Sequence, residues 1–259
     1  MKTRIIKSPN MTVILGQITD NLLHQHYAVQ LTVALNEPFE VITASSRYRA
    51  SDFAAKPMVK HQLNSAGSVL VLLVNPASRF GHTLSKHLLK EDHSAIPEQL
   101  LTPLTVLAKQ WHQQEISDQR FLEFLKQLTD GLVHTCSFKQ PLGDTRISQA
   151  LDYIERYHER VIPATELADL TALSTSRFLH LFKHVTGVSY RRMQLWLRLM
   201  ASFDLVGSTL TMTQLAHSSG FADSAHYCRT FKECFGYTPS AVFKRSEFES
   251  ITTNKKTTG

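Results

Sequence analysis

The chain has 259 residues, of which 42% are hydrophobic, so it is long enough to fold around two ordinary cores. The net charge of +6 is shared evenly, with 14 Lys and Arg against 11 Asp and Glu on each side of residue 140, so bulk charge fits a polyanionic partner without identifying one. Three cysteines without metal-like spacing, Cys136, Cys228 and Cys234, exclude a disulfide framework and a zinc finger. Without an apolar run of 18 residues or a signal peptide, we expect a cytoplasmic protein with no membrane partner.

The first part of the chain, up to about residue 76, has a strand-like apolar pattern. Apolar residues alternate with others over residues 29–35, which predicts a half-buried strand, and the continuous apolar run 69–74 predicts a strand covered on both faces. Turn sequences separate the strands at residues 36–38, 56–57 and 64–67. Short strands at this spacing predict a small barrel or sandwich.

Helical spacing replaces this pattern after residue 76. Leucines at 84, 88 and 89 predict a short helix, and apolar positions over 100–111 and 121–132 predict two longer helices, the first interrupted or begun near Pro103. These helices either cover one face of the strands or pair with a second subunit.

A proline and a glycine within residues 137–144 predict a linker. It separates a first domain, residues 1–136, from a second domain, residues 145–247, and residues 248–259 are expected to form a polar tail. The second domain begins with Ile147, Leu151 and Ile154 at helical spacing, which predict an amphipathic helix.

The second domain then contains one pattern twice. Each copy has a Leu-Ala pair, a Phe-Lys pair, a glycine and a Ser or Thr, and the copies begin at Leu167 and Leu215. A solenoid needs at least three copies. The repeat therefore predicts two helix-turn-helix units.

The second helix of each unit is expected to turn an apolar face inward, with Ser174 and Asp223 as N-terminal caps. Small, polar and basic side chains remain on the outer face, which suits a helix that enters a DNA major groove, although each one alone is equally compatible with ordinary solvated surface. Arg229 is the strongest candidate for a base or phosphate contact. The outward residues are Thr175, Ser176, Leu179, His180 and Lys183 in the first unit, and Ser224, Ala225, Cys228, Arg229 and Lys232 in the second.

A long helix from Tyr190 to about residue 206, capped by Ser189, is expected to join the units. About 17 residues at ~1.5 Å each span roughly 25 Å, whereas successive major-groove faces of B-DNA are ~34 Å apart. We therefore expect either bent DNA or one loosely bound unit. On this helix, Arg191 and Arg192 are expected to contact phosphates, and Arg198 to contact a phosphate or an internal acid.

Motifs spread over residues 145–245 carry a resemblance to a known family. They are Leu167-Ala168, Phe182-Lys183, Gly187, Gly220-Phe221-Ala222-Asp223, Arg229-Thr230-Phe231-Lys232, Phe235-Gly236 and Thr238-Pro239. This segment, about two-fifths of the chain, resembles the DNA-binding domain of the AraC/XylS family of bacterial transcription regulators. It departs from the family pattern at Tyr190, where a proline is usual, and at Pro163, where a Ser or Thr cap is common.

The resemblance implies an α+β protein. Its first domain would be a cupin-like β-barrel with flanking helices, which senses an effector or forms a dimer. Its second would be an all-α domain of two helix-turn-helix units joined by a long helix.

Three histidines in the first domain are candidate metal ligands. His24 and His26 share one face of a strand because side chains alternate along it, and His61 belongs to a second motif. A cupin metal site would also have a carboxylate shortly after the histidine pair, where Gln30 stands. We therefore expect an effector pocket or plain packing here, with no metal or other cofactor.

The leading interpretation is a sequence-specific transcription regulator that binds double-stranded DNA and is not an enzyme. Its expected partners are a small-molecule effector, a second copy of the chain and, if it activates transcription, RNA polymerase. The alternative is a metal-binding cupin-type enzyme or metal sensor fused to a DNA-binding tail. Neither a Ser/His/Asp or Cys/His constellation nor a glycine-rich phosphate loop is visible in the sequence.

Overall fold

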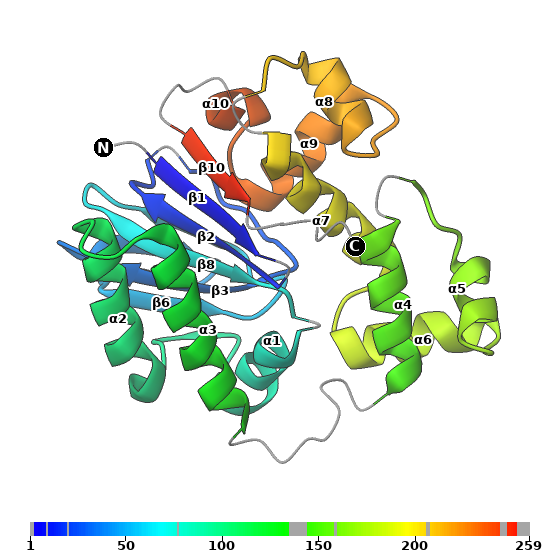
Figure 1. Cartoon of the computed structure of the whole chain (residues 1–259), viewed down its shortest axis with the longest axis horizontal. Coiled ribbons are helices and arrows are strands. Elements are labelled where there is room, and N and C mark those ends of the chain that lie inside the picture. Colours follow the sequence, from blue (N-terminus) through cyan, green and yellow to red (C-terminus); the bar gives the residue numbers. More distant parts are fainter. Residues whose placement is uncertain are drawn as a thin grey trace.

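The structure, a computed structural model, describes residues 3–8, 10–19, 21–76, 78–134, 144–157, 160–205, 208–243 and 248–252. Strands dominate up to residue 74 and helices follow, so the fold is α+β as predicted (Figure 1). Residues 137–143 of the expected linker, and Cys136, lie outside the described residues. No helix among the described residues has the length and apolar character needed to cross a membrane.

The strands form two sheets where a small barrel or sandwich was expected. The larger sheet has the order β10-β1-β2-β8-β3-β6-β9, and the smaller one has the order β5-β4-β7. The strands are β1 (Thr3–Ser8), β2 (Met11–Gly16), β3 (Val29–Ala34), β4 (Phe39–Thr43), β5 (Arg47–Ala50), β6 (Asp52–Ala55), β7 (His61–Asn64), β8 (Val69–Val74), β9 (His93–Ser94) and β10 (Phe248–Thr252).

One strand of the larger sheet comes from the far end of the chain. β10 runs parallel to β1, with Phe248 opposite Thr3 and Ile251 opposite Ile6 (Figure 1). The other pairs in both sheets are antiparallel. Residues 248–252 are therefore part of the sheet, whereas we expected residues 248–259 to form a polar tail.

Helices cover one face of the larger sheet (Figure 1). They are α1 (Arg79–Thr83), the π-helical turn η1 (Leu84–Leu88), α2 (Glu98–His112) and α3 (Asp118–His134). Alternate residues of the sheet, including Leu31 and Leu72, share a core with Leu104, Trp111 and Phe121 of these helices. The predicted helices thus bury their apolar face within one chain.

The opposite face of the sheet is covered as well, by the smaller sheet and the C-terminal helices. Ile5, Val71 and Leu73 share a second core with Trp196 and Phe231 from the helical part of the chain. β8 is buried along its whole length, as predicted. The half-buried interpretation of β3 is wrong: Gln30 and Thr32 are also buried, because this second layer covers them.

The helical part contains the predicted repeat. Its elements are α4 (Thr145–Arg156), α5 (Ala164–Leu170), α6 (Thr175–Thr186), α7 (Tyr190–Ser202), the 3-10 turn η2 (Phe203–Leu205), α8 (Met212–Ser218), α9 (Ser224–Phe235) and α10 (Pro239–Phe243). Ser174 and Asp223 cap α6 and α9 through backbone amides, as predicted. Thr211 and Gln214 form a capping box at α8. Ser189 lies at the N-cap of α7 but makes no side-chain capping bond.

Candidate DNA-binding surface and interdomain cavity

Two helix pairs, α5 with α6 and α8 with α9, have the geometry of helix-turn-helix units. The Leu-Ala pairs of the leading helices are fully buried, as are Phe182 and Phe231 of the second helices. In the turns, Ala172 of the first unit and Gly220 of the second both have positive φ, 53° and 77°. α7 contacts α6, α8 and α9 and so joins the two units (Figure 1).

The residues expected on the outer faces of α6 and α9 lie there. Leu179 is 40% exposed although it is apolar, and Arg229 is exposed on α9. Thr175, Ser224 and Cys228 are partly buried. Those fully on the surface are Ser176, Leu179, His180, Lys183, Ala225, Arg229 and Lys232. Each second helix therefore presents small, polar and basic groups outward, opposite its phenylalanines.

α7 differs from its expected form. It ends at Ser202 and continues as a 3-10 turn, so its 13 residues span roughly 20 Å at ~1.5 Å each. Arg191 and Arg192 are exposed, as expected. The interpretation of Arg198 is wrong: its side chain is buried, and its guanidinium donates to the Arg160 carbonyl (3.3 Å), not to a phosphate or an acid.

Hydrogen bonds that the sequence did not predict join α7, α4 and α5 to the segment before the first unit. The Tyr190 hydroxyl donates to the Ile162 carbonyl (2.6 Å), so the residue that replaces the family's proline has a structural role. Glu166 of α5 accepts from the Tyr153 hydroxyl (2.6 Å) and the Arg160 guanidinium (2.5 Å). The hydrogen bonds from Arg160, chiefly, and Tyr153 lower the pKa of Glu166 to about 2.

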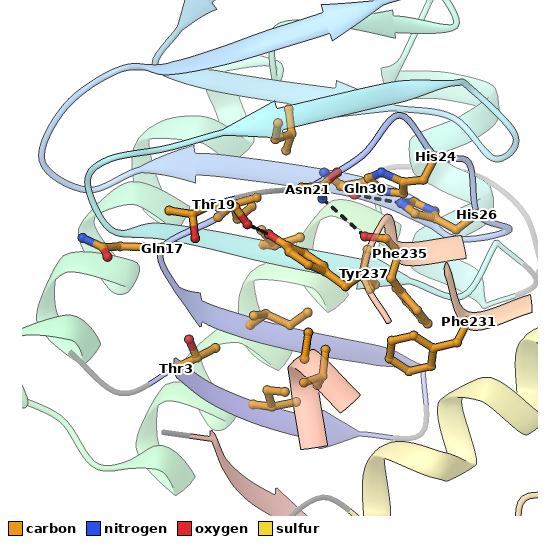
Figure 2. Close-up of a pocket in the computed structure, with 18 of the residues that line it drawn as sticks. Thr3, Gln17, Thr19, Asn21, His24, His26, Gln30, Phe231, Phe235 and Tyr237 are labelled. Carbon is orange, nitrogen blue, oxygen red and sulfur yellow. Dashed lines mark hydrogen bonds between the residues drawn. The ribbon is translucent and has the colours of Figure 1, made fainter. Parts of the chain in front are cut away.

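The second unit docks on the first domain through the C-terminal end of α9. The Leu22 amide donates to the Gly236 carbonyl (3.2 Å), and the Asn21 side-chain amide donates to the Phe235 carbonyl (3.3 Å). The Tyr237 hydroxyl donates to the Thr19 carbonyl (2.7 Å; Figure 2). This loop–helix contact has no local sequence signal, because its partners are more than 200 residues apart.

A cavity of about 120 Å³ lies between this unit and the larger sheet. Its walls are mostly apolar, with Phe231 and Phe235 of α9 on one side and strand residues such as Ile5 and Leu73 on the other. Polar groups gather around Asn21, His24, His26 and Gln30 (Figure 2). Asn21 Oδ1 is buried and accepts no hydrogen bond from the described residues. The cavity therefore lies between the larger sheet and the inner face of α9, the helix whose outer face carries Arg229.

The structure brings the three candidate histidines together, and two of them, His24 and His26, line this cavity. His24, His26 and His61 are buried, and the ligand nitrogens that they offer lie within 4.8 Å of one another. Burial, with a smaller contribution from His26, lowers the pKa of His24 to about 3. Burial also lowers the pKa of His26 and of His61, so all three rings are neutral near pH 7.

The paired units define a helix-turn-helix domain, and comparison with known proteins agrees. Residues 167–245 match a family model described as "Helix-turn-helix domain". The match lies within the segment whose motifs resemble the DNA-binding domain of the AraC/XylS family of bacterial transcription regulators. Over 120 residues it is 30% identical to the HTH-type transcriptional activator RhaS of Yersinia pestis, covering 46% of this chain and 43% of RhaS. An HTH-type transcriptional regulator of Staphylococcus aureus is 29% identical over 116 residues, which are 44% of this chain and 15% of the relative.

Solved structures share the whole fold. ToxT from Vibrio cholerae O395 aligns with a TM-score of 0.59 at 13% identity, covering 92% of this chain and 98% of ToxT. ToxT from strain SCE256 with an unsaturated fatty acid bound aligns with a TM-score of 0.56 at 14% identity, covering 90% and 95%. The likeness extends through both the sheet domain and the helical domain.

Proposed function

We propose that the chain is a sequence-specific transcription regulator in which α6 and α9 each enter a major groove of double-stranded DNA. The observation that carries this proposal is the pair of equivalent helices with small, polar and basic outer faces. Arg229 pairs with a base, and Lys183, Arg191 and Arg192 contact phosphates. Selection of bound duplexes from a random pool tests this: one enriched motif is expected, and an unenriched pool contradicts it.

The short α7 supports bending of the bound duplex. Its roughly 20 Å length is well below the ~34 Å between successive major-groove faces on one side of B-DNA. When both units bind, the duplex bends toward the protein so that the two grooves approach each other. Gel mobility of a selected site placed at different positions in a fragment measures the bend. Position-independent mobility, with both grooves protected, contradicts bending.

We propose further that the cavity binds a small effector and that this alters DNA binding. A ligand there touches the sheet and, through Phe231 and Phe235, the face of α9 opposite Arg229. The ligand changes the affinity for DNA only if its own affinity differs between two arrangements of α9, the one that binds DNA and the one in the free protein. ToxT with a bound fatty acid supports a ligand-binding role for this fold.

The cavity chemistry narrows the class of effector. A cavity of ~150 Å³ holds benzene, so about 120 Å³ suits a compact molecule of that order. The lining residues include no Lys or Arg, and the lining histidines are neutral, so the protein groups alone offer a carboxylate no cationic partner. The free acceptor at Asn21 Oδ1 favours a ligand with one hydroxyl or N–H donor.

A comparison of phenol with benzene separates the requirement for a compact ligand from the requirement for a hydrogen-bond donor. We expect phenol to raise the thermal midpoint of unfolding more than benzene does, because only phenol can donate to Asn21 Oδ1. The larger side chain in Val242→Phe is expected to abolish both shifts, since Val242 lines the cavity. Equal shifts for the two compounds contradict the assigned donor, and shifts that persist in Val242→Phe contradict the assigned cavity.

A homodimer and a contact with RNA polymerase also belong to the proposal. Sedimentation of the free and DNA-bound protein tests the first, and transcription from a selected site with purified polymerase tests the second. A monomer on DNA, or transcription unchanged by the protein, contradicts the respective partner.

A further inference from the structure

Three buried histidines come from two segments that the fold pairs. The backbones of His24 and His61 form an antiparallel bridge, with N–H to carbonyl distances of 3.0 and 2.9 Å. Their ring centroids are 4.5 Å apart, and the His26 ring lies 5.2 Å from that of His61. The three rings therefore surround one small volume, and two of them, His24 and His26, also line the cavity.

Each ring is fixed by a backbone carbonyl two residues away. Nδ1 of His24 lies 2.8 Å from the Leu22 oxygen, and Nδ1 of His61 lies 2.9 Å from the Val59 oxygen. Nδ1 of His26 makes the same contact with the Ala28 oxygen at 3.1 Å. A carbonyl only accepts, so each neutral ring carries its proton on Nδ1 and has a lone pair on Nε2. This arrangement is typical of metal-bound histidines.

A fourth acceptor points at the same volume. Gln30 Oε1 lies 2.8 Å from His26 Nε2 (Figure 2) and 3.2 Å from His61 Nε2, while Gln30 Nε2 donates to the Thr32 hydroxyl (3.0 Å). The amide oxygen and the two ring nitrogens all offer lone pairs, and none has a proton to share. A bound cation resolves this conflict. Without one, the Gln30 amide must turn round and donate to both rings.

We propose that His24, His26 and His61 bind a divalent transition metal through Nε2, with Gln30 Oε1 as a fourth ligand. Neutral imidazoles suit zinc, copper, iron and nickel, whereas magnesium and calcium require oxygen ligands. A tetrahedral site with metal–nitrogen bonds of ~2.05 Å places its nitrogens ~3.3 Å apart. The ligand nitrogens lie within 4.8 Å of one another, so metal binding shortens their separations by at most about 1.5 Å.

The site is placed to influence the helical domain. The ring of His26 lies 5.8 Å from that of Trp196 on α7, the helix that joins the two units. His24 and His26 also line the cavity, so the metal would form part of its wall. The proposed metal site rests on its own geometry, and its test involves no DNA. Its outcome is therefore independent of the proposed regulator function.

Cobalt(II) titration of the full chain, without a histidine tag and after chelator treatment, tests the site. We expect one Co²⁺ per chain, with visible d–d absorption. In a Trp111→Phe background Co²⁺ quenches the fluorescence of Trp196, since the chain has two tryptophans. His24→Gln and His61→Gln are each expected to weaken binding at least ~10-fold. His184→Gln, a change of an exposed histidine on α6, should leave it unchanged.

Gln30→Glu keeps the test decisive if a histidine variant fails to fold. The new carboxylate adds a negative charge beside the metal, so Co²⁺ should bind more tightly than in the wild type. Weaker binding in Gln30→Glu overturns the proposal. So does a folded wild-type chain without d–d absorption at saturating Co²⁺, or equal binding by the wild type and a folded His61→Gln variant.

Discussion

Gly236 and Gly187 occupy equivalent positions at the C-terminal ends of α9 and α6, and replacing each with alanine isolates the contact between domains. Both have a left-handed backbone, with φ of 71° and 75°. A side chain in this conformation costs roughly 1–2 kcal/mol, and both variants carry that cost. An added Cβ at Gly187 meets no atom within 4 Å, whereas at Gly236 it lies 2.5 Å from the Leu22 carbonyl oxygen and 2.8 Å from the Leu22 nitrogen.

The difference in the free energy of unfolding between the two variants measures how much the docking of the second unit on the first domain stabilises the chain. Backbone must shift in Gly236→Ala, which strains the hydrogen bonds from Leu22 to Gly236 and from Asn21 to Phe235. Each is worth about 1 kcal/mol, so we expect Gly236→Ala to lose roughly 2 kcal/mol more than Gly187→Ala. Urea unfolding followed by circular dichroism compares the two free energies. Equal losses would refute the reasoning, because they would mean that this contact contributes nothing.

Two further predictions concern the DNA surface and the first unit. Arg229→Ala should cost about 1–3 kcal/mol of binding to a selected site and alter base preference, whereas Lys183→Ala should mainly reduce the salt slope of binding, by about 1. Identical salt slopes and base preferences in both variants would contradict these roles. Glu166 has a folded pKa of about 2, below its ordinary value of 4.5, so the unfolded chain takes up protons first and stability falls as pH drops from about 4.5 toward 2. Unfolding midpoints at pH 5 and pH 3 should differ less in Glu166→Gln than in the wild type, and an equal difference would show that Glu166 does not contribute.

Local patterns were sufficient to predict much of the helical domain. Ser174 and Asp223 cap their helices because a short polar side chain before an amphipathic run reaches the free amides of the first turn. The exposed positions of His180 and Arg229 follow from helical spacing alone. These features depend on residues within one or two turns of each other.

Features that depend on distant partners were missed. The pairing of residues 248–252 with β1 joins opposite ends of the chain, and nothing local in this short segment indicates it. The burial of Gln30 and Arg198 likewise depends on layers contributed by other segments. The sequence suggested the three histidines as a group but could not show that each Nδ1 is held by a carbonyl, which is the observation that favours a metal.

Footprinting on a selected DNA site tests the central claim most directly. Two helices that enter neighbouring grooves should protect two patches about one helical turn, ~34 Å, apart. Arg229→Ala should weaken protection at one patch, and His180→Ala should weaken it at the other. A footprint that remains unchanged when Arg229 and His180 are replaced together would contradict the assignment of α6 and α9 as the DNA-reading helices.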